Sequence, residues 1–196
     1  MPVTELNPTV ALVAVDLQHG IVNLPVAPHS AAEVVARTAK LAARFRAVGA
    51  PVVWVRVSHE PDGGATLRVR VDQPGGAPNL DPQWSTLVDE LDVQPTDLVI
   101  TKRQWGAFHG TELDSQLRRR GVTDIVLTGL VTNMGVESTA RQAHEHGYHT
   151  VIVSDAISGL SPDDHHFAVQ RIFPKISQVD TTDYLLAHLE SVFAAV

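Results

Sequence analysis

The sequence predicts a three-layer α/β/α sandwich built on a six-stranded parallel sheet. Short apolar segments alternate with longer segments of helical periodicity, the apolar segments are hydrophobic on both faces, and the helical segments end at glycines. Strands buried on both faces are typical of the centre of a parallel sheet, and their alternation with helices gives right-handed crossover connections. We therefore expect a ligand site at the carboxyl edge of the sheet.

Five segments have the composition of buried strands. Each is short, apolar throughout and rich in β-branched residues. They are residues 11–15 (ALVAV), 51–57 (PVVWVRV), 97–101 (DLVIT), 124–128 (DIVLT) and 149–153 (HTVIV). A sixth strand is expected near residues 176–179.

Helical periodicity marks the segments between and after these strands. We expect helices over residues 30–48, 110–120, 134–146 and 182–194, with a further one starting at SPDDHHF, residues 161–167. Glycines 49, 121 and 147 follow the first three, and glycine is the usual residue at a left-handed helix C-cap. The proline-rich and glycine-rich segment 58–84 breaks the alternation, so it predicts a long loop over the site.

The composition narrows the class of protein. The 196 residues are 44% hydrophobic, enough for one core, so we expect a single domain over residues 1–196. The chain has no cysteine, which excludes a disulfide, a thiolate nucleophile and a cysteine metal site. A formal charge of -7 disfavours nucleic acid and anionic membranes as partners. Because no signal peptide or membrane-length apolar run is visible, we expect a cytoplasmic protein.

Two charged residues end predicted strands. Asp16 follows the first strand and Lys102 follows the third, so both should lie at the carboxyl edge of the sheet. The ammonium would favour the ionised carboxylate and restrain its orientation. Taken alone, Asp16 could instead cap a helix or bond a loop, and Lys102 could be a solvated strand end.

A tight turn follows the fourth strand in TGLVTNMGVESTARQAHEHG, residues 128–147. Backbone N–H groups at the helix start could stabilise an anion or a developing oxyanion. The alternative is ordinary capping by Thr132 or Asn133, with Glu137 and Arg141 as an exposed i,i+4 pair.

At this point the chain resembles the isochorismatase-like, or cysteine hydrolase, superfamily. The resemblance rests on AVDLQHG, TKRQWGAFHGTEL, TGLVTNMGVESTARQA and VIVSDAISG, which occur in family order and spacing over nearly the whole chain. It implies that Asp16 and Lys102 are catalytic. It also implies a cis peptide between Leu130 and Val131 that turns the Val131 N–H toward the pocket beside Gly135.

The sequence departs from most of the family at Gly135. Most members have a nucleophilic cysteine there, whereas this chain reads Thr132-Asn133-Met134-Gly135-Val136, so thiol-based amidase chemistry is not expected. Isochorismatases resemble this chain in having glycine: the aspartate protonates a vinyl ether carbon, and water adds to the oxocarbenium ion. Their turn also contains an aromatic residue and a histidine that this chain lacks, which puts isochorismate itself in doubt.

Other residues are candidates for binding the substrate. Trp84, Trp105 and Phe108 could line an apolar pocket or belong to the core. Gln18 and His19 follow Asp16 and could orient it or the substrate. Thr132 and Ser138 have no histidine base adjacent in the sequence, so a hydroxyl nucleophile is not favoured.

We expect neither a metal nor a cofactor. The histidine groups at 144–149 and 163–166 fit a helix carboxyl end and an acidic first turn, and the D-x-H metal cluster of nicotinamidases reads Val57-Ser58-His59 here. The prediction is a hydrolase of a small, carboxylated molecule; the alternative is a ligand-binding or interaction protein that kept the scaffold. The resemblance also implies a homo-oligomer, a dimer or a tetramer.

Overall fold

The computed structural model describes residues 3–73 and 79–194. One parallel sheet has the strand order β3-β2-β1-β4-β5-β6, which confirms the predicted fold class. The strands are β1 (Val10–Val15), β2 (Val52–Val57), β3 (Leu98–Lys102), β4 (Asp124–Leu130), β5 (His149–Ser158) and β6 (Gln178–Asp180). The helices are α1 (His19–Val22), α2 (Ala31–Ala47), α3 (Leu113–Arg119), α4 (Glu137–Glu145), α5 (Pro162–Phe167) and α6 (Thr182–Ala194).

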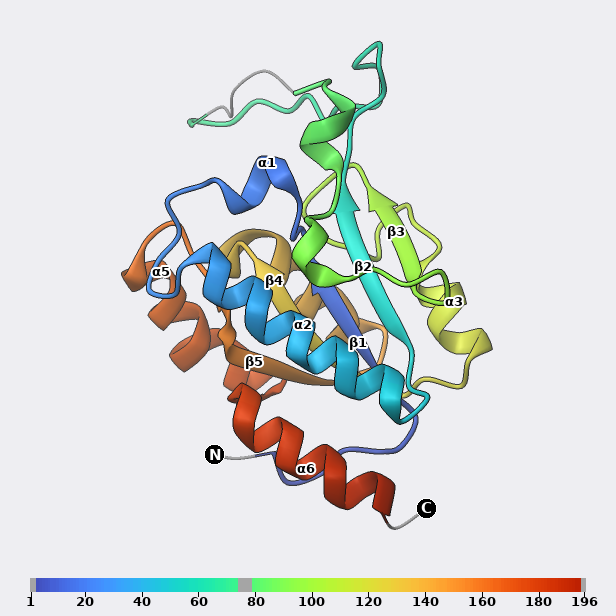
Figure 1. Ribbon diagram of the computed structural model, residues 1–196. Helices are drawn as coiled ribbons and strands as arrows, with labels where there is room; N and C mark the ends of the chain where they lie inside the picture. Colours follow the sequence, from blue (N-terminus) through green and yellow to red (C-terminus); the bar gives the residue numbers. More distant parts are fainter. Residues whose placement is uncertain (1–2, 74–78, 195–196) are drawn as a thin grey trace.

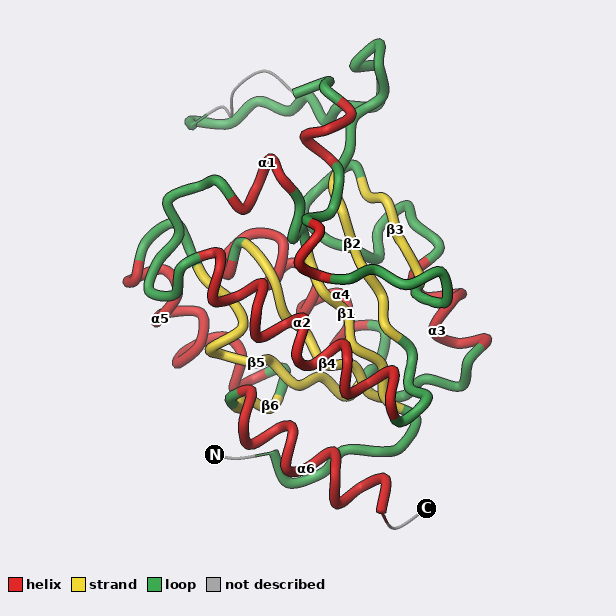
Figure 2. The backbone as a smooth tube through the Cα atoms, viewed as in Figure 1, coloured by secondary structure: helices red, strands yellow, loops and turns green. Residues whose placement is uncertain are grey.

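Helices cover both faces of the sheet (Figures 1 and 2). Alternate residues of β1 point to opposite faces, so Leu12 belongs to the core beneath α2 and α6 and Val13 to the core beneath α3 and α4. Every residue of β1 and β4 is buried, as the apolar runs predict for central strands. Among the helices of the described residues, none has the length and apolar character needed to cross a membrane.

Local signals fix the ends of α2. The Ser30 side chain accepts from the Glu33 N–H while the Glu33 carboxylate accepts from the Ser30 N–H, a capping box. Gly49 follows the helix with φ 73°, a conformation that favours glycine.

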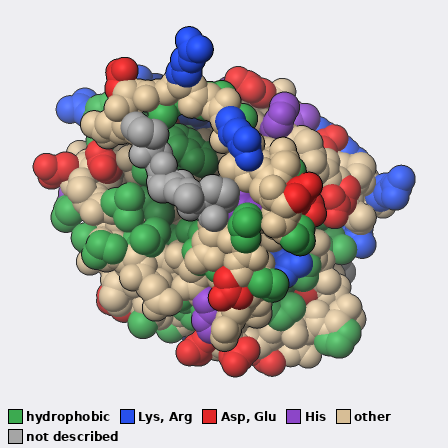
Figure 3. All heavy atoms as spheres, turned by 90° about the horizontal axis from the view of Figure 1, so that it is seen from above, with side chains coloured by type: hydrophobic (Ala, Val, Ile, Leu, Met, Phe, Trp, Pro, Cys, Tyr) green, Lys and Arg blue, Asp and Glu red, His purple; other side chains and the backbone are tan. Residues whose placement is uncertain are grey.

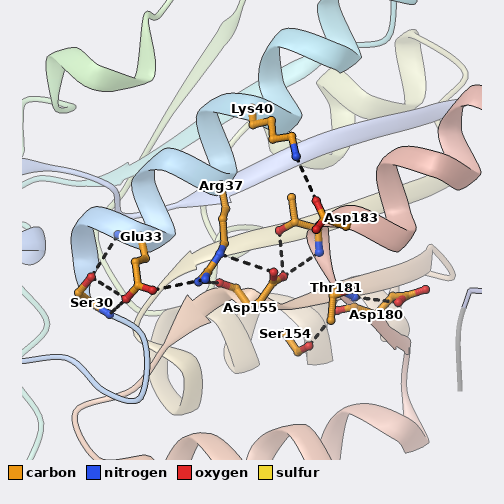
Figure 4. A network of polar contacts seen from close by, with 10 residues as sticks. Ser30, Glu33, Arg37, Lys40, Ser154, Asp155, Asp180, Thr181 and Asp183 are labelled. Carbon is orange, nitrogen blue, oxygen red and sulfur yellow. Dashed lines mark hydrogen bonds and ion pairs between the residues drawn. The ribbon is translucent and has the colours of Figure 1, made fainter.

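A polar network ties α2, β5 and α6 together (Figure 4). Arg37 of α2 donates to the Asp155 backbone carbonyl at 2.7 Å, and the Asp155 carboxylate accepts from the Thr182 N–H at the start of α6. Lys40 and Asp183 form an exposed ion pair at 3.0 Å in the same network. These contacts hold the outer layer against the sheet below the site.

The carboxyl edge of the sheet is covered by α1 and by the long segment 58–84, which extends away from the body, while both termini lie near the opposite edge (Figure 1). Residues 74–78 of this segment, with two of its prolines and one of its glycine pairs, lie outside the described residues. A 3₁₀ turn, Pro82–Ser85, ends the segment. The predicted helix over 134–146 is α4 preceded by a π-helical turn, Thr132–Val136.

Candidate active site

The carboxyl ends of β1 and β4 meet at the point where the strand order reverses. Val15 of β1 pairs with Gly129 of β4, and a Cβ on Gly129 would lie 2.0 Å from the Val15 carbonyl oxygen. Only glycine permits this close approach, and Gly129 also has φ 112°. The residue after β1 therefore lies beside the turn after β4, at the place where ligands bind in open α/β sheets.

Asp16 and Lys102 form a buried ion pair at this point. Lys102 ends β3, two strands away from β1, and its Nζ reaches across β2 to lie 2.7 Å from Asp16 Oδ2. Lys102 is only 2% exposed and Asp16 only 6%, so the interpretation of Lys102 as a solvated strand end is wrong. Asp16 itself has φ 56°, a left-handed conformation that is uncommon outside glycine and often found at functional sites.

The two carboxylate oxygens of Asp16 have different surroundings. Oδ2 accepts from Lys102, whereas Oδ1 is buried and has no hydrogen-bond partner among the described residues. The nearby Val57 N–H donates to Gln18 Oε1 instead. Burial raises the pKa of the Asp16 carboxyl above its usual range, and the Lys102 ammonium offsets only part of this effect. A proton held by Asp16 would therefore reside on Oδ1.

Gly135 lies directly against this carboxylate. A Cβ built on Gly135 would be 3.0 Å from Asp16 Oδ2 and 3.3 Å from the Leu130 carbonyl oxygen. Position 135 therefore faces Asp16, and even a Cβ there would be tight against the carboxylate. The three residues predicted to be catalytic lie together.

The turn that positions Gly135 begins with the cis peptide Leu130-Val131, as the family resemblance implied. Val131 is buried, and its carbonyl accepts from the Met134 and Val136 N–H groups. Neither Thr132 nor Asn133 caps the following helix with its side chain, so the capping interpretation is wrong. The predicted Glu137–Arg141 pair is present, with a hydrogen bond of 2.9 Å. The direction of the Val131 N–H toward a substrate stays a prediction.

Sequence reasoning missed the partner of Thr132. Its hydroxyl lies 3.0 Å from Nδ1 of His165 in α5, and both residues are buried. Burial among His29 and His166 lowers the pKa of His165 to about 4, so the ring is neutral at physiological pH. No sequence signal joins residues 33 positions apart; the contact arises because α5 packs on the turn.

A second set of contacts fixes Gly135 from α4. The Thr139 hydroxyl donates to the Gly135 carbonyl at 2.7 Å and accepts from the Ala107 N–H at 3.1 Å. Thr139 therefore connects the turn after β4 to the loop after Lys102, whose Nζ also donates to the Trp105 carbonyl at 2.7 Å.

Gln18 connects the segments around Asp16, and both hydrogens of its side-chain amide are bonded to backbone carbonyls. Its Nε2 donates to the carbonyls of Val57 and Trp84, at 2.9 and 3.2 Å, and its Oε1 accepts from the Val57 N–H. Gln18 is fully buried. The predicted substrate contact by Gln18 is therefore not supported, because these bonds use both amide hydrogens.

Trp84 anchors the end of the segment 58–84 to α1. A Cβ on Gly20 would lie 2.0 Å from Trp84 Nε1, so the indole packs directly on the Gly20 backbone. The His59 ring lies 5.8 Å from the Trp84 ring, and burial lowers the pKa of His59. His19 is half-buried at the start of α1, where its N–H donates to the Thr86 carbonyl.

The other two aromatic candidates differ in their surroundings. Trp105 adjoins the site through its carbonyl, which accepts from Lys102 Nζ, and the residue is 61% exposed. Phe108 is buried in the core and stacks on His146 with ring centroids 5.0 Å apart, beyond the carboxyl end of α4. Phe108 thus packs at the carboxyl end of α4, whereas Gly135 precedes the amino end of that helix. The predicted role of Phe108 in binding is not supported.

A metal cluster and a second cavity are the other places where a ligand could bind. Within residues 3–73 and 79–194, no three His, Asp or Glu side chains are close enough to hold a metal ion. A cavity of about 660 Å³ lies at the opposite, amino edge of the sheet, next to the Arg46–Asp97 ion pair, and none of its lining residues belongs to the Asp16 site.

The chain is a hydrolase with a three-layer α/β/α fold and a buried Asp-Lys pair at the carboxyl edge of the sheet. The chain belongs to the isochorismatase family, because the model of the isochorismatase domain matches residues 10–183. An uncharacterized isochorismatase family protein, YecD of Escherichia coli O157:H7, is 48% identical over 93% of this chain and 97% of its own. The structure of an isochorismatase family protein from Burkholderia thailandensis is 58% identical, with a TM-score of 0.94 over 97% of this chain and 99% of that one. A ureidoacrylate amidohydrolase, RutB of Pseudomonas savastanoi pv. phaseolicola, is 32% identical over 87% of this chain and 80% of its own.

Proposed function

We propose that this hydrolase cleaves a vinyl ether bond in a small carboxylated molecule, with Asp16 as the general acid and without a covalent intermediate. The supporting observation is that the two Asp16 carboxylate oxygens differ: Lys102 donates to Oδ2, while buried Oδ1 has no hydrogen-bond partner in the part of the chain that the structure describes. Since the chain contains no cysteine, the covalent thiol route of its cysteine-containing relatives is closed.

In the proposed reaction, Asp16 Oδ1 gives its proton to the terminal carbon of the vinyl group. The resulting oxocarbenium ion takes up water at its central carbon, and the water proton restores Asp16. Collapse of the hemiketal then releases an alcohol and a methyl ketone. The Lys102 ammonium stabilises the Asp16 carboxylate that forms during the proton transfer.

The charge balance at the site favours a carboxylated substrate. Lys102 has three N–H donors, of which Asp16 and the Trp105 carbonyl take two, so one is left for a substrate carboxylate. A substrate carboxylate at this position adds negative charge beside Asp16 and further favours its protonated form. Gly135 keeps any side chain off Oδ2, from which a Cβ would be only 3.0 Å away.

The test is hydrolysis of a panel of enolpyruvyl ethers and of ureido and amide compounds in D₂O. Vinyl ether cleavage by carbon protonation places one deuterium in the methyl group of the ketone, after correction for exchange of the product. We expect Asp16→Asn to lower kcat/KM by about 10²- to 10⁴-fold. Asp183→Asn is the matched control, because Asp183 has the same side chain and a lysine partner at the surface.

Two outcomes would overturn this proposal. One is full activity of Asp16→Asn on the best vinyl ether. The other is stabilisation of the wild type by panel compounds without turnover of any of them, which would favour the ligand-binding alternative.

A further inference from the structure

The loop after β3, residues 103–109, provides the second anchor of the Lys102 ammonium. Lys102 Nζ donates to two acceptors, Asp16 Oδ2 and the Trp105 carbonyl oxygen, each at 2.7 Å. An ammonium at the end of a flexible side chain takes the position that its acceptors define. The distance between Lys102 and Asp16 therefore depends on where the loop holds the Trp105 carbonyl.

The backbone of this loop does little to fix its own position. Residues 103–109 have no regular secondary structure, and among the described residues no backbone N–H of residues 104–109 donates to another backbone carbonyl. On the face of the molecule above the site, Lys and Arg side chains project into solvent (Figure 3), whereas Lys102 is buried. The position of the Lys102 ammonium is therefore set by contacts within the protein.

Two side chains of α4 supply contacts that hold the loop. Thr139 Oγ1 accepts from the Ala107 N–H at 3.1 Å, and Gln142 Oε1 accepts from the Phe108 N–H at 3.0 Å. The two side chains are three positions apart on the helix, so they lie on one face of it. A Cβ on Gly106 would lie 2.3 Å from Gln142 Oε1, so the glycine lets this side chain pack directly on the loop backbone.

Thr139 also joins the loop to the turn that faces Asp16. Its hydroxyl donates to the Gly135 carbonyl at 2.7 Å, and the residue is fully buried. The same hydroxyl is a donor toward Gly135 and an acceptor toward Ala107, so both of its roles are in use. Because Gly135 lies against Asp16 and the loop holds Lys102, both partners of the ion pair are positioned from the same helix.

We propose that Thr139 and Gln142 are positioning residues for the buried ion pair: they hold the loop 103–109 and, through the Trp105 carbonyl, keep the Lys102 ammonium against Asp16. Both act through Lys102 and not by touching the substrate. The kinetic part of the test rests on the proposed function, in which Asp16 is the general acid.

Loss of these contacts should change the titration of Asp16. Burial raises the pKa of the Asp16 carboxyl, and Lys102, the one charged group among the described residues that acts on this carboxyl, offsets part of the effect. An ammonium that is held less closely offsets less of it, so the titration should move to higher pH. A general acid is active while it is protonated, so the fall of kcat/KM with rising pH should move in the same direction.

The test compares Thr139→Val, which has the shape of threonine without the hydroxyl, with Thr139→Ser, which keeps the hydroxyl. ¹³C NMR of the full chain, labelled at the aspartate carboxyl carbons, follows Asp16 over pH, and Asp16→Asn assigns its signal. We expect Thr139→Val to move the Asp16 titration to higher pH and to lower kcat/KM on the best vinyl ether on the order of tenfold. Thr139→Ser should restore both.

Thr38→Val is the matched control. Thr38 is fully buried in α2, and its hydroxyl has no hydrogen-bond partner within residues 3–73 and 79–194. This variant should leave both the Asp16 titration and kcat/KM unchanged.

Gln142→Leu tests the other contact to the loop. Because Gln142 is only partly buried, this variant keeps the test available if Thr139→Val does not fold. It should move the Asp16 titration in the same direction as Thr139→Val. Gln116→Leu is its control, since Gln116 is a partly buried glutamine on α3 that bonds Arg120.

The proposal is overturned if the folded variants titrate Asp16 as the wild type does, or at lower pH. A loss of stability without a shift of the titration has the same consequence. If the titration shifts but no compound of the panel is cleaved, the positioning role stands and the proposed function fails. If vinyl ethers are cleaved and the titration is unchanged, the proposed function stands and the positioning role fails.

Discussion

Position 135 faces the Asp16 carboxylate, since a Cβ on Gly135 would lie 3.0 Å from Asp16 Oδ2. The same geometry would place a thiol against an acid and an ammonium in relatives that have cysteine there. In this chain position 135 has no side chain, and the proposed chemistry falls to Asp16 and water. Four predictions follow from the site and its supports.

Gly135→Cys should create a single reactive thiol and abolish vinyl ether cleavage. The new side chain fills the space beside Asp16 and must also fit 3.2 Å from Val15 Cγ1. Because the chain has no other cysteine, alkylation by iodoacetamide and intact mass report on this thiol alone. Gly135→Ala, which fills space without a nucleophile, is the control. Undiminished vinyl ether turnover by both variants would mean that the substrate does not occupy this space.

Breaking the buried Asp16–Lys102 pair should lower the free energy of unfolding, and replacing both partners should restore much of the loss. Lys102→Met leaves the buried Asp16 carboxyl without its ammonium, for which we expect a loss of about 3 to 5 kcal/mol in the free energy of unfolding. In Asp16→Asn/Lys102→Met no charge is left buried, so the double variant should be more stable than Lys102→Met. Urea denaturation at pH 7 measures both, with exposed Lys40→Met as the control. A double variant whose loss of unfolding free energy equals the summed losses of Asp16→Asn and Lys102→Met would contradict this prediction.

Protonation of His165 should destabilise the fold in acid. Its pKa is lowered to about 4 from 6.5 by burial, so the unfolded chain binds the proton more readily, and stability falls as pH drops from 6.5 through about 4. His165→Asn removes this titration, so its melting temperature should depend less on pH over that range. Asp16 has the opposite effect on stability. Because its pKa is raised in the folded chain, it stabilises the fold at low pH, and this contribution is lost as pH rises through the folded-state pKa. Exposed His149→Asn is the control; equal pH slopes for wild type and His165→Asn would refute the assignment.

Gly20→Ala should displace Trp84 and loosen the loop over the site. The added methyl would overlap the indole, at 2.0 Å from Nε1, and the backbone of Gly20 cannot yield without moving α1. We expect a red shift of the emission in a Trp105→Phe background, where the fully buried Trp54 is the other fluorophore and stays unchanged, and a KM raised more than kcat is lowered. Gly64→Ala on the same loop is the control, since its Cβ would meet only the Asp62 side chain. Unchanged emission would show that the indole is not held by Gly20.

The convergence of Asp16 and Lys102 was predictable from the sequence. Both end apolar segments with strand composition, and parallel strands bring their carboxyl ends to one edge. The glycine C-caps at 49, 121 and 147 also follow a local rule, and each has positive φ. Local patterns of this kind depend on neighbouring residues, so they can be read along the chain.

The roles of the polar and aromatic side chains could not be predicted in the same way. Gln18 and Phe108 were both expected to contact the substrate. The Gln18 amide is bonded to the backbone of Val57 and Trp84, and the Phe108 ring stacks on His146. A side chain near a site in sequence can point into the core or bond a neighbouring loop, and this depends on contacts between distant segments. The pairing of Thr132 with His165 is of this kind, since it exists only because α5 packs on the turn.

The sequence by itself determined the layers, the sheet edge that holds the site, and the absence of a thiol from it, because strand periodicity, glycine caps and residue identity are local properties. The tertiary structure alone decided which oxygen of Asp16 accepts from Lys102 and which has no partner within residues 3–73 and 79–194. The balance between burial and the Lys102 charge depends on how closely three strands and one turn pack, and no local pattern encodes that distance.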